Sequence, residues 1–262
     1  MSEEILQGGV ANAGAVVRVG DHVLRPSNPH TPTIHALLRH VRAAGFDGVP
    51  EPIGVDPDGR ERLVFIEGDV PFPPFPEWSQ TDEALTSTVA LLRRFHEATR
   101  DFVAPSGGSW NVDLADTVGG PVICHNDVCP ENVVYRDGVA VALLDFDFAA
   151  PGRPLYDLAQ LAKMCIPVDP PEEAARQNRG TLDPFHRLRL VADAYGLPPG
   201  RGEFLAVIDE AVASGGQFVR ARVERGEPAF VKMWNEMGGE ARYDKRRAWL
   251  AQNRDRFSDA LG

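Results

Sequence analysis

Three residues whose side chains could bind a metal ion and accept a proton lie within the segment 124–152. They are Asp127, Asn132 and Asp145. A carboxylate and an amide oxygen placed together suit a hard cation such as Mg²⁺ when phosphates and water occupy its other positions. Another carboxylate nearby can accept the proton of a substrate hydroxyl. These residue types therefore indicate phosphoryl transfer, in which positioning and charge stabilisation do most of the catalysis.

A β-hairpin is expected to bring the three side chains together. The stretches NVVYR and VAVALLDF are typical of strands, and Asp137-Gly138 between them is a strong signal for a tight turn. Asn132 begins this hairpin and Asp145 ends it, so the two residues should lie side by side. Asp127 stands in the loop just before Asn132 and can face the same point.

The rest of the chain divides into a β-rich first part and a larger helical second part. Before residue 70, β-branched stretches joined by turns predict strands, with one amphipathic helix at 33–46 among them. The proline-rich segment at 70–78 cannot form a regular element and marks the expected boundary between lobes 1–70 and 71–262. Apolar residues at helical spacing then predict helices at 82–102, 156–164, 182–196, 202–226 and 240–257. The predicted fold class is α+β with two lobes.

Several motifs, taken with their spacing, resemble the catalytic core of the aminoglycoside phosphotransferase family, which shares the protein-kinase-like fold. The motifs are His125-Asn126-Asp127, Asn132, Leu144-Asp145-Phe146-Asp147 and Tyr156-Asp157-Leu158-Ala159. The resemblance implies a two-lobed protein-kinase-like fold with a small β-rich N-terminal lobe and a larger mainly helical C-terminal lobe. It also implies Asp127 as the catalytic base, and Asn132 and Asp145 as the ligands of Mg²⁺.

Three further residues of these motifs are expected to support the site. His125 is interpreted as a structural residue of the loop rather than a proton carrier. Asp147 could help to hold the metal or its waters, face substrate amines, or only end the strand. Asp157 would brace the catalytic loop, as the resemblance suggests.

The same resemblance places a nucleotide, ATP or GTP, beneath the small lobe. Gly8 and Gly9 belong to a glycine-rich turn whose backbone N–H groups could approach phosphates, although it lacks the G-x-G-x-x-G pattern. Arg25 stands where the fold normally has a phosphate-binding lysine, and arginine can grip phosphate oxygens in a bidentate way. His35 stands where the partner glutamate is expected, so the usual ion pair is missing and His35 could only repel Arg25 or stack on it.

The connection between the lobes is expected in LVFIEGDVP, residues 63–71. Its backbone would meet the purine at Phe65, Ile66, Glu67 and Gly68. Backbone recognition leaves almost no trace in the side chains, so an ordinary strand and turn is the alternative interpretation of this stretch.

The composition restricts the partners and the compartment. A net charge of −11 disfavours nucleic acid as a partner, because its binding needs clustered Lys and Arg, and it would suit a cationic small-molecule acceptor.

No secretory signal precedes the fold and no apolar run approaches the ~18 residues of a membrane span, so a cytoplasmic protein without membrane contact is expected. The odd number of cysteines favours reduced thiols. By type, Cys124, His125, Asp127 and Cys129 could suggest a zinc site, but they lack a paired C-x-x-C or H-x-x-x-H unit.

The predicted function is Mg²⁺-dependent transfer of a phosphoryl group from ATP or GTP to a hydroxyl of a small molecule. That acceptor could be an aminoglycoside, in which case the enzyme would confer antibiotic resistance, or another antibiotic or a metabolite. The alternative is a pseudokinase-like binding protein or toxin-immunity protein that performs no turnover. The missing Lys–Glu pair and the atypical glycine-rich turn favour this alternative, whereas the set of Asp127, Asn132 and Asp145 favours the enzyme.

Overall fold

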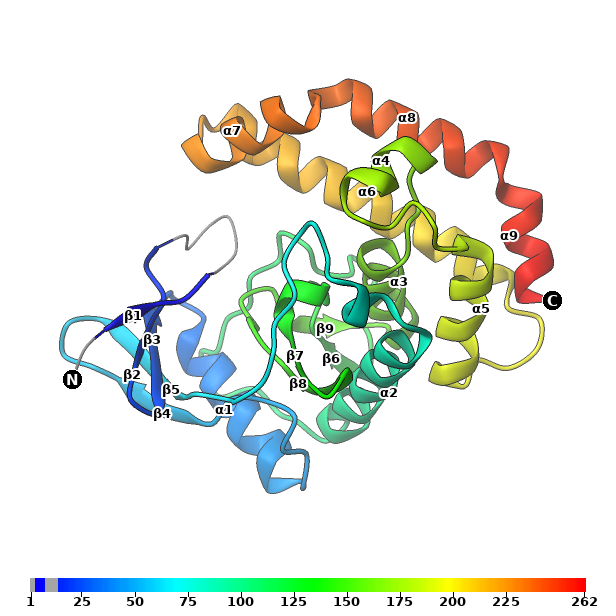
Figure 1. Cartoon of the computed structure of the whole chain (residues 1–262). Helices are drawn as coiled ribbons and strands as arrows, with labels where there is room; N and C mark the ends of the chain where they lie inside the picture. Colours follow the sequence, from blue (N-terminus) through cyan, green and yellow to red (C-terminus); the bar gives the residue numbers. More distant parts are fainter. Residues whose placement is uncertain (1–2, 8–13) are drawn as a thin grey trace.

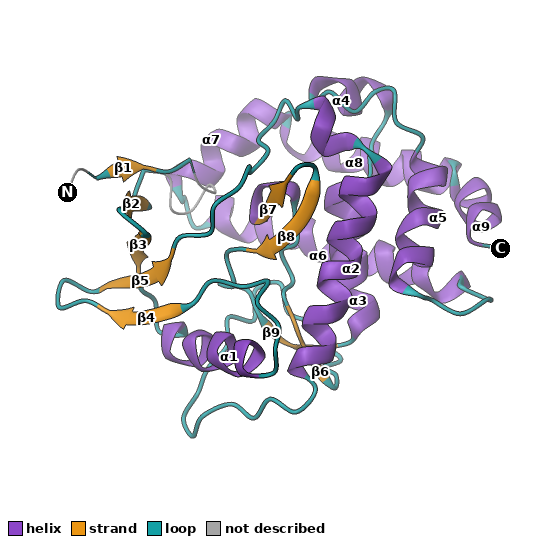
Figure 2. Ribbon diagram, turned by 60° about the horizontal axis from the view of Figure 1, so that its bottom comes forward, coloured by secondary structure: helices purple, strands orange, loops and turns teal. Residues whose placement is uncertain are grey.

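The small lobe is built on an antiparallel sheet and one helix. The computed structural model describes residues 3–7 and 14–262, so the glycine-rich turn expected at Gly8 and Gly9 lies outside the described residues. The strands pair in the order β1-β2-β3-β5-β4, as Figure 1 and Figure 2 show. The elements are β1 (Glu4–Ile5), β2 (Val17–Val19), β3 (His22–Pro26), α1 (Thr31–Ala43), β4 (Pro52–Val55) and β5 (Arg60–Val64).

Tight turns between neighbouring strands and one amphipathic helix build the small lobe. Gly20 and Gly59 have φ values of 60° and 83°, which glycine adopts without strain, and they join β2 to β3 and β4 to β5. Helix α1 begins at Thr31, two residues before the expected start, because Pro32 suits the first helical turn, where no backbone N–H is needed. The apolar face of α1 is buried, as its spacing predicts. The predicted strands and helix of this lobe are confirmed.

The large lobe consists of helices around two short β-pairs. The β7–β8 hairpin lies between the sheet of the small lobe and helices α2 and α3 (Figure 2). Up to the hairpin the elements are the 3₁₀ helix η2 (Glu77–Gln80), α2 (Asp82–Thr99), β6 (Val122–Cys124), η3 (Pro130–Asn132), β7 (Val133–Arg136) and β8 (Val139–Leu143). They continue with β9 (Ala150–Gly152), α3 (Pro154–Cys165), α4 (Pro171–Arg176), α5 (Pro184–Tyr195), α6 (Gly202–Glu224), α7 (Pro228–Met237), α8 (Gly239–Gln252) and α9 (Arg254–Leu261).

The hairpin forms at the predicted turn. Asp137 and Gly138 have φ values of 51° and 78°, the left-handed conformation that a two-residue turn between strands requires at both positions. Beside it, β6 pairs with β9 in an antiparallel arrangement, so that Cys124 faces Ala150. This second pairing was not predicted, because β9 is only three residues long and carries no alternating pattern.

The core of the large lobe is made by helices that pack on one another and on the hairpin. Helix α2 lies against α5 and β8, and α3 lies against α6. Phe95 on α2, Leu158 on α3 and Phe204 on α6 are almost completely buried in it. Thr81 caps α2 by accepting a hydrogen bond from the backbone N–H of Ala84 at 3.1 Å. The hairpin joins this core through its packing on α2.

Three features of the last third of the chain differ from the sequence-based expectation. The predicted helix 240–257 is two helices, α8 and α9, separated at Asn253. Helices α4 and α7 were not predicted, because α4 is short and the glycines near α7 obscure its period. Trp234 on α7 is an apolar residue of this helix that stays half-buried, and it stacks on Tyr243 with ring centroids 5.4 Å apart.

The connection between the lobes follows the outer edge of the hairpin. Asp69 and Tyr135 exchange two backbone hydrogen bonds of 2.8 Å. Gly68 has a φ of 149°, and a Cβ atom there would lie 2.5 Å from the carbonyl oxygen of Tyr135, so only glycine fits this close approach. The division at residue 70 stays a prediction.

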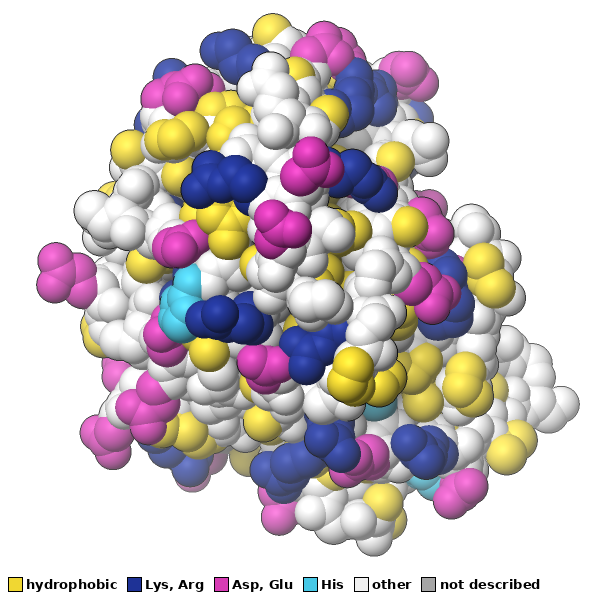
Figure 3. Space-filling model, turned by 90° about the vertical axis from the view of Figure 1, so that its right-hand side faces the viewer, with side chains coloured by type: hydrophobic (Ala, Val, Ile, Leu, Met, Phe, Trp, Pro, Cys, Tyr) yellow, Lys and Arg dark blue, Asp and Glu magenta, His cyan; other side chains and the backbone are white. Residues whose placement is uncertain are grey.

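Among the described residues, every helix is too short or too polar to cross a bilayer. On the face of the molecule away from the small lobe, Lys and Arg side chains alternate with Asp and Glu (Figure 3). The net negative charge is therefore not gathered into one patch on that face.

Candidate active site

The hairpin brings Asp127, Asn132 and Asp145 to one end of the β7–β8 pair. The Nδ2 atom of Asn132 donates to the carbonyl oxygen of Asp127 at 2.9 Å and to its Oδ2 atom at 3.2 Å. Leu144, next to Asp145, donates its backbone N–H to the carbonyl oxygen of Asn132 at 2.8 Å. Asn132 thus contacts Asp127 through its side chain and the residue before Asp145 through its backbone.

Two residues of this site adopt a backbone conformation that side chains normally avoid. Asn126 has a φ of 65° and Asp145 a φ of 58°. Such left-handed conformations at residues other than glycine persist only where surrounding contacts hold them, and they concentrate at functional sites. The side chain of Asp145 is 29% exposed, so its carboxylate is presented to solvent at the end of the hairpin.

Asp157, at the start of α3, fixes the loop that carries Asp127. It is completely buried and accepts backbone N–H bonds from His125 at 2.6 Å and Asn126 at 2.7 Å. His96 on α2 contacts the same carboxylate through Nε2 at 2.8 Å. Burial alone would raise the pKa of Asp157, but the hydrogen bond and charge of His96 and the N–H of His125 hold it below its usual value.

His125 joins the loop to the end of the hairpin. Its Nε2 atom lies 2.8 Å from the carbonyl oxygen of Leu144, and its Nδ1 atom accepts the backbone N–H of Asp127 at 3.3 Å. The ring also packs on Phe146 with centroids 4.6 Å apart. Burial lowers the pKa of His125, which favours the neutral ring that this pair of bonds requires. His125 therefore links the backbone of Asp127 to that of Leu144, the residue before Asp145.

Arg25 on β3 reaches across from the small lobe to the end of the hairpin. Its Nη1 atom contacts Asp145 at 2.9 Å, its Nη2 atom contacts Asp147, and its Nε atom contacts Glu61 on β5 at 2.5 Å. Burial acts against the charge of Arg25, but these three carboxylates raise its pKa above the usual value. Arg25 and Asp145 are thus placed together although the chain separates them widely.

The expectation that Arg25 lacks a glutamate partner is wrong. Glu61 faces Arg25 directly across the β3–β5 pair, and its second carboxylate oxygen contacts Nε2 of His35 at 2.7 Å. His35 on α1 therefore neither repels Arg25 nor stacks on it, because Glu61 lies between them. The ion pair expected between strand and helix is replaced here by a chain of three residues, with the carboxylate supplied by the neighbouring strand.

The remaining nucleotide-side residues lie at the connection after β5. Phe65, Ile66, Glu67 and Gly68 form an extended segment without regular structure. Arg18 on β2 stacks on Phe65 at 3.7 Å and pairs with Glu67 at 2.5 Å, which ties this segment to the sheet. The structure thus places the segment between the lobes, and its role towards a purine stays a prediction.

Lys163 is a residue of the site that the sequence interpretation missed. Its Nζ atom contacts Oε1 of Gln160 one turn earlier on α3 and lies 3.5 Å from the carbonyl oxygen of Ala211 on α6. Burial lowers the pKa of Lys163 to about 8, against the opposing effect of Asp127. Burial and Asp145 raise the pKa of Asp127 to about 7, while Lys163 acts to lower it. The signal in the sequence is a lysine in an otherwise apolar helix just after the motif that contains Asp157.

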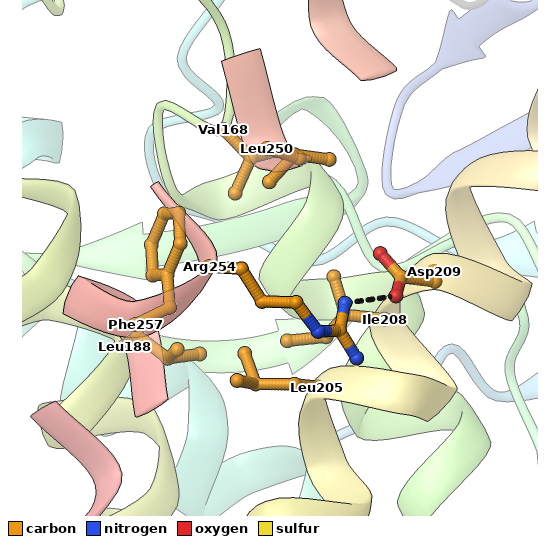
Figure 4. A pocket seen from close by; sticks show the side chains of 8 residues that line it. All are labelled: Val168, Leu188, Leu205, Ile208, Asp209, Leu250, Arg254 and Phe257. Atoms are coloured by element: carbon orange, nitrogen blue, oxygen red, sulfur yellow. Dashed lines mark hydrogen bonds and ion pairs between the residues drawn. The ribbon is translucent and has the colours of Figure 1, made fainter. Parts of the chain in front are cut away.

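Two other clusters of the described residues do not form a catalytic site. The small apolar cavity beneath α8 and α9 is lined by Leu188, Leu205 and Phe257 and bordered by the ion pair of Arg254 with Asp209 at 2.5 Å (Figure 4). It is distant in sequence from the motifs and has an apolar lining.

His96, Cys124 and Asp157 are residue types that can bind a metal ion, but the carboxylate of Asp157 already accepts two backbone N–H bonds.

Known proteins resemble this chain in sequence and in fold. The profile of the phosphotransferase enzyme family matches residues 109–191, the part that contains Asp127, Asn132, Asp145 and Asp157. The trifolitoxin immunity protein of Rhizobium leguminosarum bv. trifolii is 32% identical over 274 residues, which cover all of both chains.

Solved structures share the fold at low sequence identity. A choline/ethanolamine kinase family protein from Mesorhizobium loti superposes with a TM-score of 0.66 at 18% identity, over 100% of this chain and 92% of the other. The GDP complex of aminoglycoside 2'-phosphotransferase-IIIa gives a TM-score of 0.60 at 14% identity, over 95% and 93% of the chains. These likenesses confirm the predicted two-lobed kinase-like fold. With the full-length relative and the matched motifs, they show that the chain belongs to the phosphotransferase enzyme family.

Proposed function

We propose that this protein is a Mg²⁺-dependent kinase that transfers the γ-phosphoryl group of ATP or GTP to a hydroxyl of a small molecule. The observation that carries the proposal is the convergence of Asp127, Asn132 and Asp145 at one end of the hairpin, with Arg25 reaching the same point from the small lobe. A passive binding protein has no use for this combination. The cytoplasm, where nucleoside triphosphates are available, is the proposed compartment.

The oxygen atoms at the end of the hairpin fit a magnesium ion. Among the described residues, Arg25 is the only donor to the Asp145 carboxylate, and it reaches only Oδ1. Asn132 uses its Nδ2 atom for Asp127, so no described residue donates to its Oδ1 atom. One carboxylate and one amide oxygen are hard ligands that suit Mg²⁺ shared with phosphates. Bound there, the ion would neutralise the charge of the transferring phosphoryl group.

Asp127 is the proposed base. Its pKa of about 7 lies near neutral pH, the range in which a carboxylate can both lose its proton and accept one from a hydroxyl. Asn132 donates to one of its oxygens. Asp157 accepts the two backbone N–H groups that precede Asp127, and His125 accepts the backbone N–H of Asp127 itself. The carboxylate is therefore oriented before an acceptor arrives, which is the main contribution a protein makes to this reaction.

Arg25 is proposed to bind the phosphates of the nucleotide. The guanidinium is kept charged and oriented by its contacts with Asp145, Asp147 and Glu61. Arginine presents parallel N–H donors that match two phosphate oxygens at once, whereas lysine offers a single point of charge. Glu61, fixed by His35, replaces the helix glutamate that holds the phosphate-binding lysine in other kinases.

The proposal is tested by measuring transfer of labelled γ-phosphate from ATP and from GTP to a panel of hydroxylated small molecules, with Mg²⁺ and with EDTA. We expect labelled product with at least one acceptor, and its loss in EDTA. In parallel, a nucleotide bound only by the folded protein must raise the melting temperature. A melting temperature that ATP and GTP leave unchanged with Mg²⁺ present, together with the absence of labelled product, would refute the proposal.

A second candidate function is protection against a toxin without turnover. Its support is the full-length likeness to a protein named trifolitoxin immunity protein. Growth of cells exposed to trifolitoxin separates the candidates when the wild type is compared with Asp127→Ala. Protection that survives this substitution favours a binding protein, whereas protection that needs Asp127 indicates that phosphorylation is the means of immunity.

A further inference from the structure

The side chain of Asn126 joins two segments of the site. Asn126 directly precedes Asp127, and its Nδ2 atom donates to the backbone carbonyl oxygen of Phe148 at 2.9 Å. Phe148 belongs to the segment 144–149, which connects β8 to β9 and carries Asp145. The loop of the proposed base is thereby bonded to the segment of a proposed metal ligand.

This amide stands at a position where glycine would fold most easily. Asn126 has a φ of 65°, a conformation that glycine adopts without strain. The residue is 1% exposed, and its Oδ1 atom is buried without a hydrogen-bond partner among the described residues. A buried polar atom left unpaired costs free energy, as does a left-handed backbone at a residue other than glycine. Within the described part of the chain, the bond to Phe148 is the only hydrogen bond of this side chain that offsets these costs.

The neighbouring residue His125 holds the same segment at its other end. Its Nε2 atom lies 2.8 Å from the carbonyl oxygen of Leu144, and Leu144 donates its backbone N–H to the carbonyl oxygen of Asn132 at 2.8 Å. Asp145 thus lies between the bonds at Leu144 and the bond that Asn126 makes. Its φ of 58° persists only where surrounding contacts hold it, and these bonds flank it on both sides.

The small lobe holds the segment in a different way, because its hydrogen bonds in the described structure end on carboxylates. Arg25 contacts Asp145 at 2.9 Å and also contacts Asp147. The Nδ2 atom of Asn28 donates to Asp147 at 3.3 Å. A metal ion and the phosphates of a nucleotide compete for these charged groups, because Arg25 is the proposed phosphate ligand. The bond from Asn126 to a backbone carbonyl takes no part in that competition.

We infer, on the basis of the proposed function, that Asn126 is a positioning residue of the metal site. Its bond to Phe148 holds the segment of Asp145 against the loop of Asp127, so that the two carboxylates keep their relative place when a nucleotide binds. The amide is buried, so it acts through the backbone and not by contact with a ligand. Its loss should weaken metal binding and slow transfer, with little effect on the binding of the acceptor.

Two substitutions remove the bond in different ways. Asn126→Gly takes away the amide and leaves a residue that adopts the same backbone conformation without strain. Asn126→Ser keeps a polar group, but its hydroxyl ends one bond short of the amide nitrogen that reaches Phe148. The second variant keeps the test decisive if the first fails to fold.

Asn178 offers a matched control outside the site. It has a φ of 61°, and its Nδ2 atom donates to the backbone carbonyl oxygen of Phe75 at 2.8 Å, so it repeats the conformation and the type of contact of Asn126. It makes no hydrogen bond to the segment 144–149 in the part of the chain that the structure describes. Asn178→Gly therefore loses the same kind of bond without disturbing the proposed metal ligands.

The first measurement is the binding of Mn²⁺, in place of Mg²⁺, in the presence of ADP, followed by electron paramagnetic resonance of the free ion. We expect the Kd for Mn²⁺ to rise about fivefold or more in Asn126→Gly and Asn126→Ser, the effect of one lost hydrogen bond. Asn178→Gly should bind Mn²⁺ as the wild type does. A role of Asn126 in stability alone would lower the melting temperature and leave this Kd unchanged.

The second measurement is the initial rate of phosphoryl transfer to an acceptor that the wild type phosphorylates. We expect kcat of Asn126→Gly to fall about tenfold or more, because small displacements of the reacting groups slow transfer strongly. KM for the acceptor should stay close to the wild-type value. A kcat of Asn126→Gly equal to that of the wild type overturns the positioning role.

The outcomes separate this inference from the proposed function. A Kd for Mn²⁺ that is unchanged in Asn126→Gly and Asn126→Ser, each with a native circular dichroism spectrum, overturns the inference while the kinase remains. The same follows if Asn178→Gly raises this Kd as much as Asn126→Gly does. A wild type that neither binds Mn²⁺ with ADP nor transfers a phosphoryl group overturns the proposed function, and the inference with it.

Discussion

Replacement of Asp157 by asparagine is expected to destabilise the whole protein strongly. The carboxylate is completely buried and accepts three hydrogen bonds, from the backbone of His125 and Asn126 and from His96. Asparagine keeps the shape, but its NH₂ group must face at least one of these donors. A hydrogen bond to a charged group contributes about 1.5–3 kcal/mol, and a buried donor left without an acceptor costs about 1–3 kcal/mol. We therefore expect a loss of about 3–5 kcal/mol of unfolding free energy.

Urea denaturation followed by far-ultraviolet circular dichroism measures this loss. The matched control is Asp209→Asn on α6, whose carboxylate is 49% exposed and pairs with Arg254, so a change within about 1 kcal/mol is expected. A loss below about 1 kcal/mol for Asp157→Asn would show that the donors find other partners and would refute the reasoning.

The pH dependence of the same difference gives an independent check. The pKa of Asp157 is lower in the folded protein than in the unfolded chain, so its contribution is complete above the unfolded value of about 3.9. It is lost as the pH falls through the lower folded value. The difference between wild type and Asp157→Asn should therefore be constant near neutral pH and shrink below about pH 4. A difference that stays constant under acidic conditions contradicts the assigned direction of the shift.

Three further substitutions follow from single contacts. Arg25→Met should raise KM for the nucleotide at least tenfold in initial-rate measurements, because one charge-assisted contact to phosphate is lost. Arg25→Lys should recover only part of this loss. Equal KM values for the wild type and both variants would exclude a phosphate role. Gly68→Ala should lower the melting temperature, because its Cβ would lie 2.5 Å from the carbonyl oxygen of Tyr135. Gly54→Ala is the control, because a Cβ atom at Gly54 would have nothing within 4 Å. Equal melting temperatures for the two variants would contradict the close approach at Gly68. Leu188→Ala should lower the free energy of unfolding by about 2–5 kcal/mol in urea denaturation, because it enlarges the apolar cavity of Figure 4. A decrease of less than about 1 kcal/mol would mean that neighbouring side chains fill the cavity.

The local features of the site could be predicted from the sequence because they depend on neighbours along the chain. Asp137-Gly138 specifies a two-residue turn by the left-handed conformation that both residues adopt, and this turn fixes which ends of the hairpin meet. The position of Asn132 and Asp145 at the same end of the hairpin follows from that register. The spacing of Asp127 from Asn132 is short enough for the loop to close between them.

The contacts that were missed depend on pairing between distant segments. Glu61 meets Arg25 because β5 lies beside β3 in one particular register, and a shift of one residue would turn Glu61 to the other face of the sheet. The sequence interpretation instead sought the partner on the helix and found His35. Lys163 was missed for a similar reason, since its proximity to Asp127 depends on how α3 packs against the loop and against α6.

The last two helices show that a periodic apolar pattern does not by itself predict where a helix ends. The residues from 240 to 257 have a continuous helical pattern, yet the helix stops at Asn253, whose side chain donates to the carbonyl oxygen of Trp249 at 2.9 Å. The same carbonyl also accepts the backbone N–H of Asn253 at 3.1 Å, and α9 after it packs on α5. Periodicity indicates which residues face the core, whereas a break of this kind is decided by tertiary packing.

The measurement that tests the central claim most directly is phosphoryl transfer by Asp127→Asn. The amide keeps the size of the carboxylate but cannot accept the hydroxyl proton as a base. With Mg²⁺ and an acceptor that the wild type phosphorylates, we predict a fall in kcat of at least about a hundredfold, the usual range for a general base. The affinity for the nucleotide should change little. Transfer by Asp127→Asn at the wild-type rate would contradict the account.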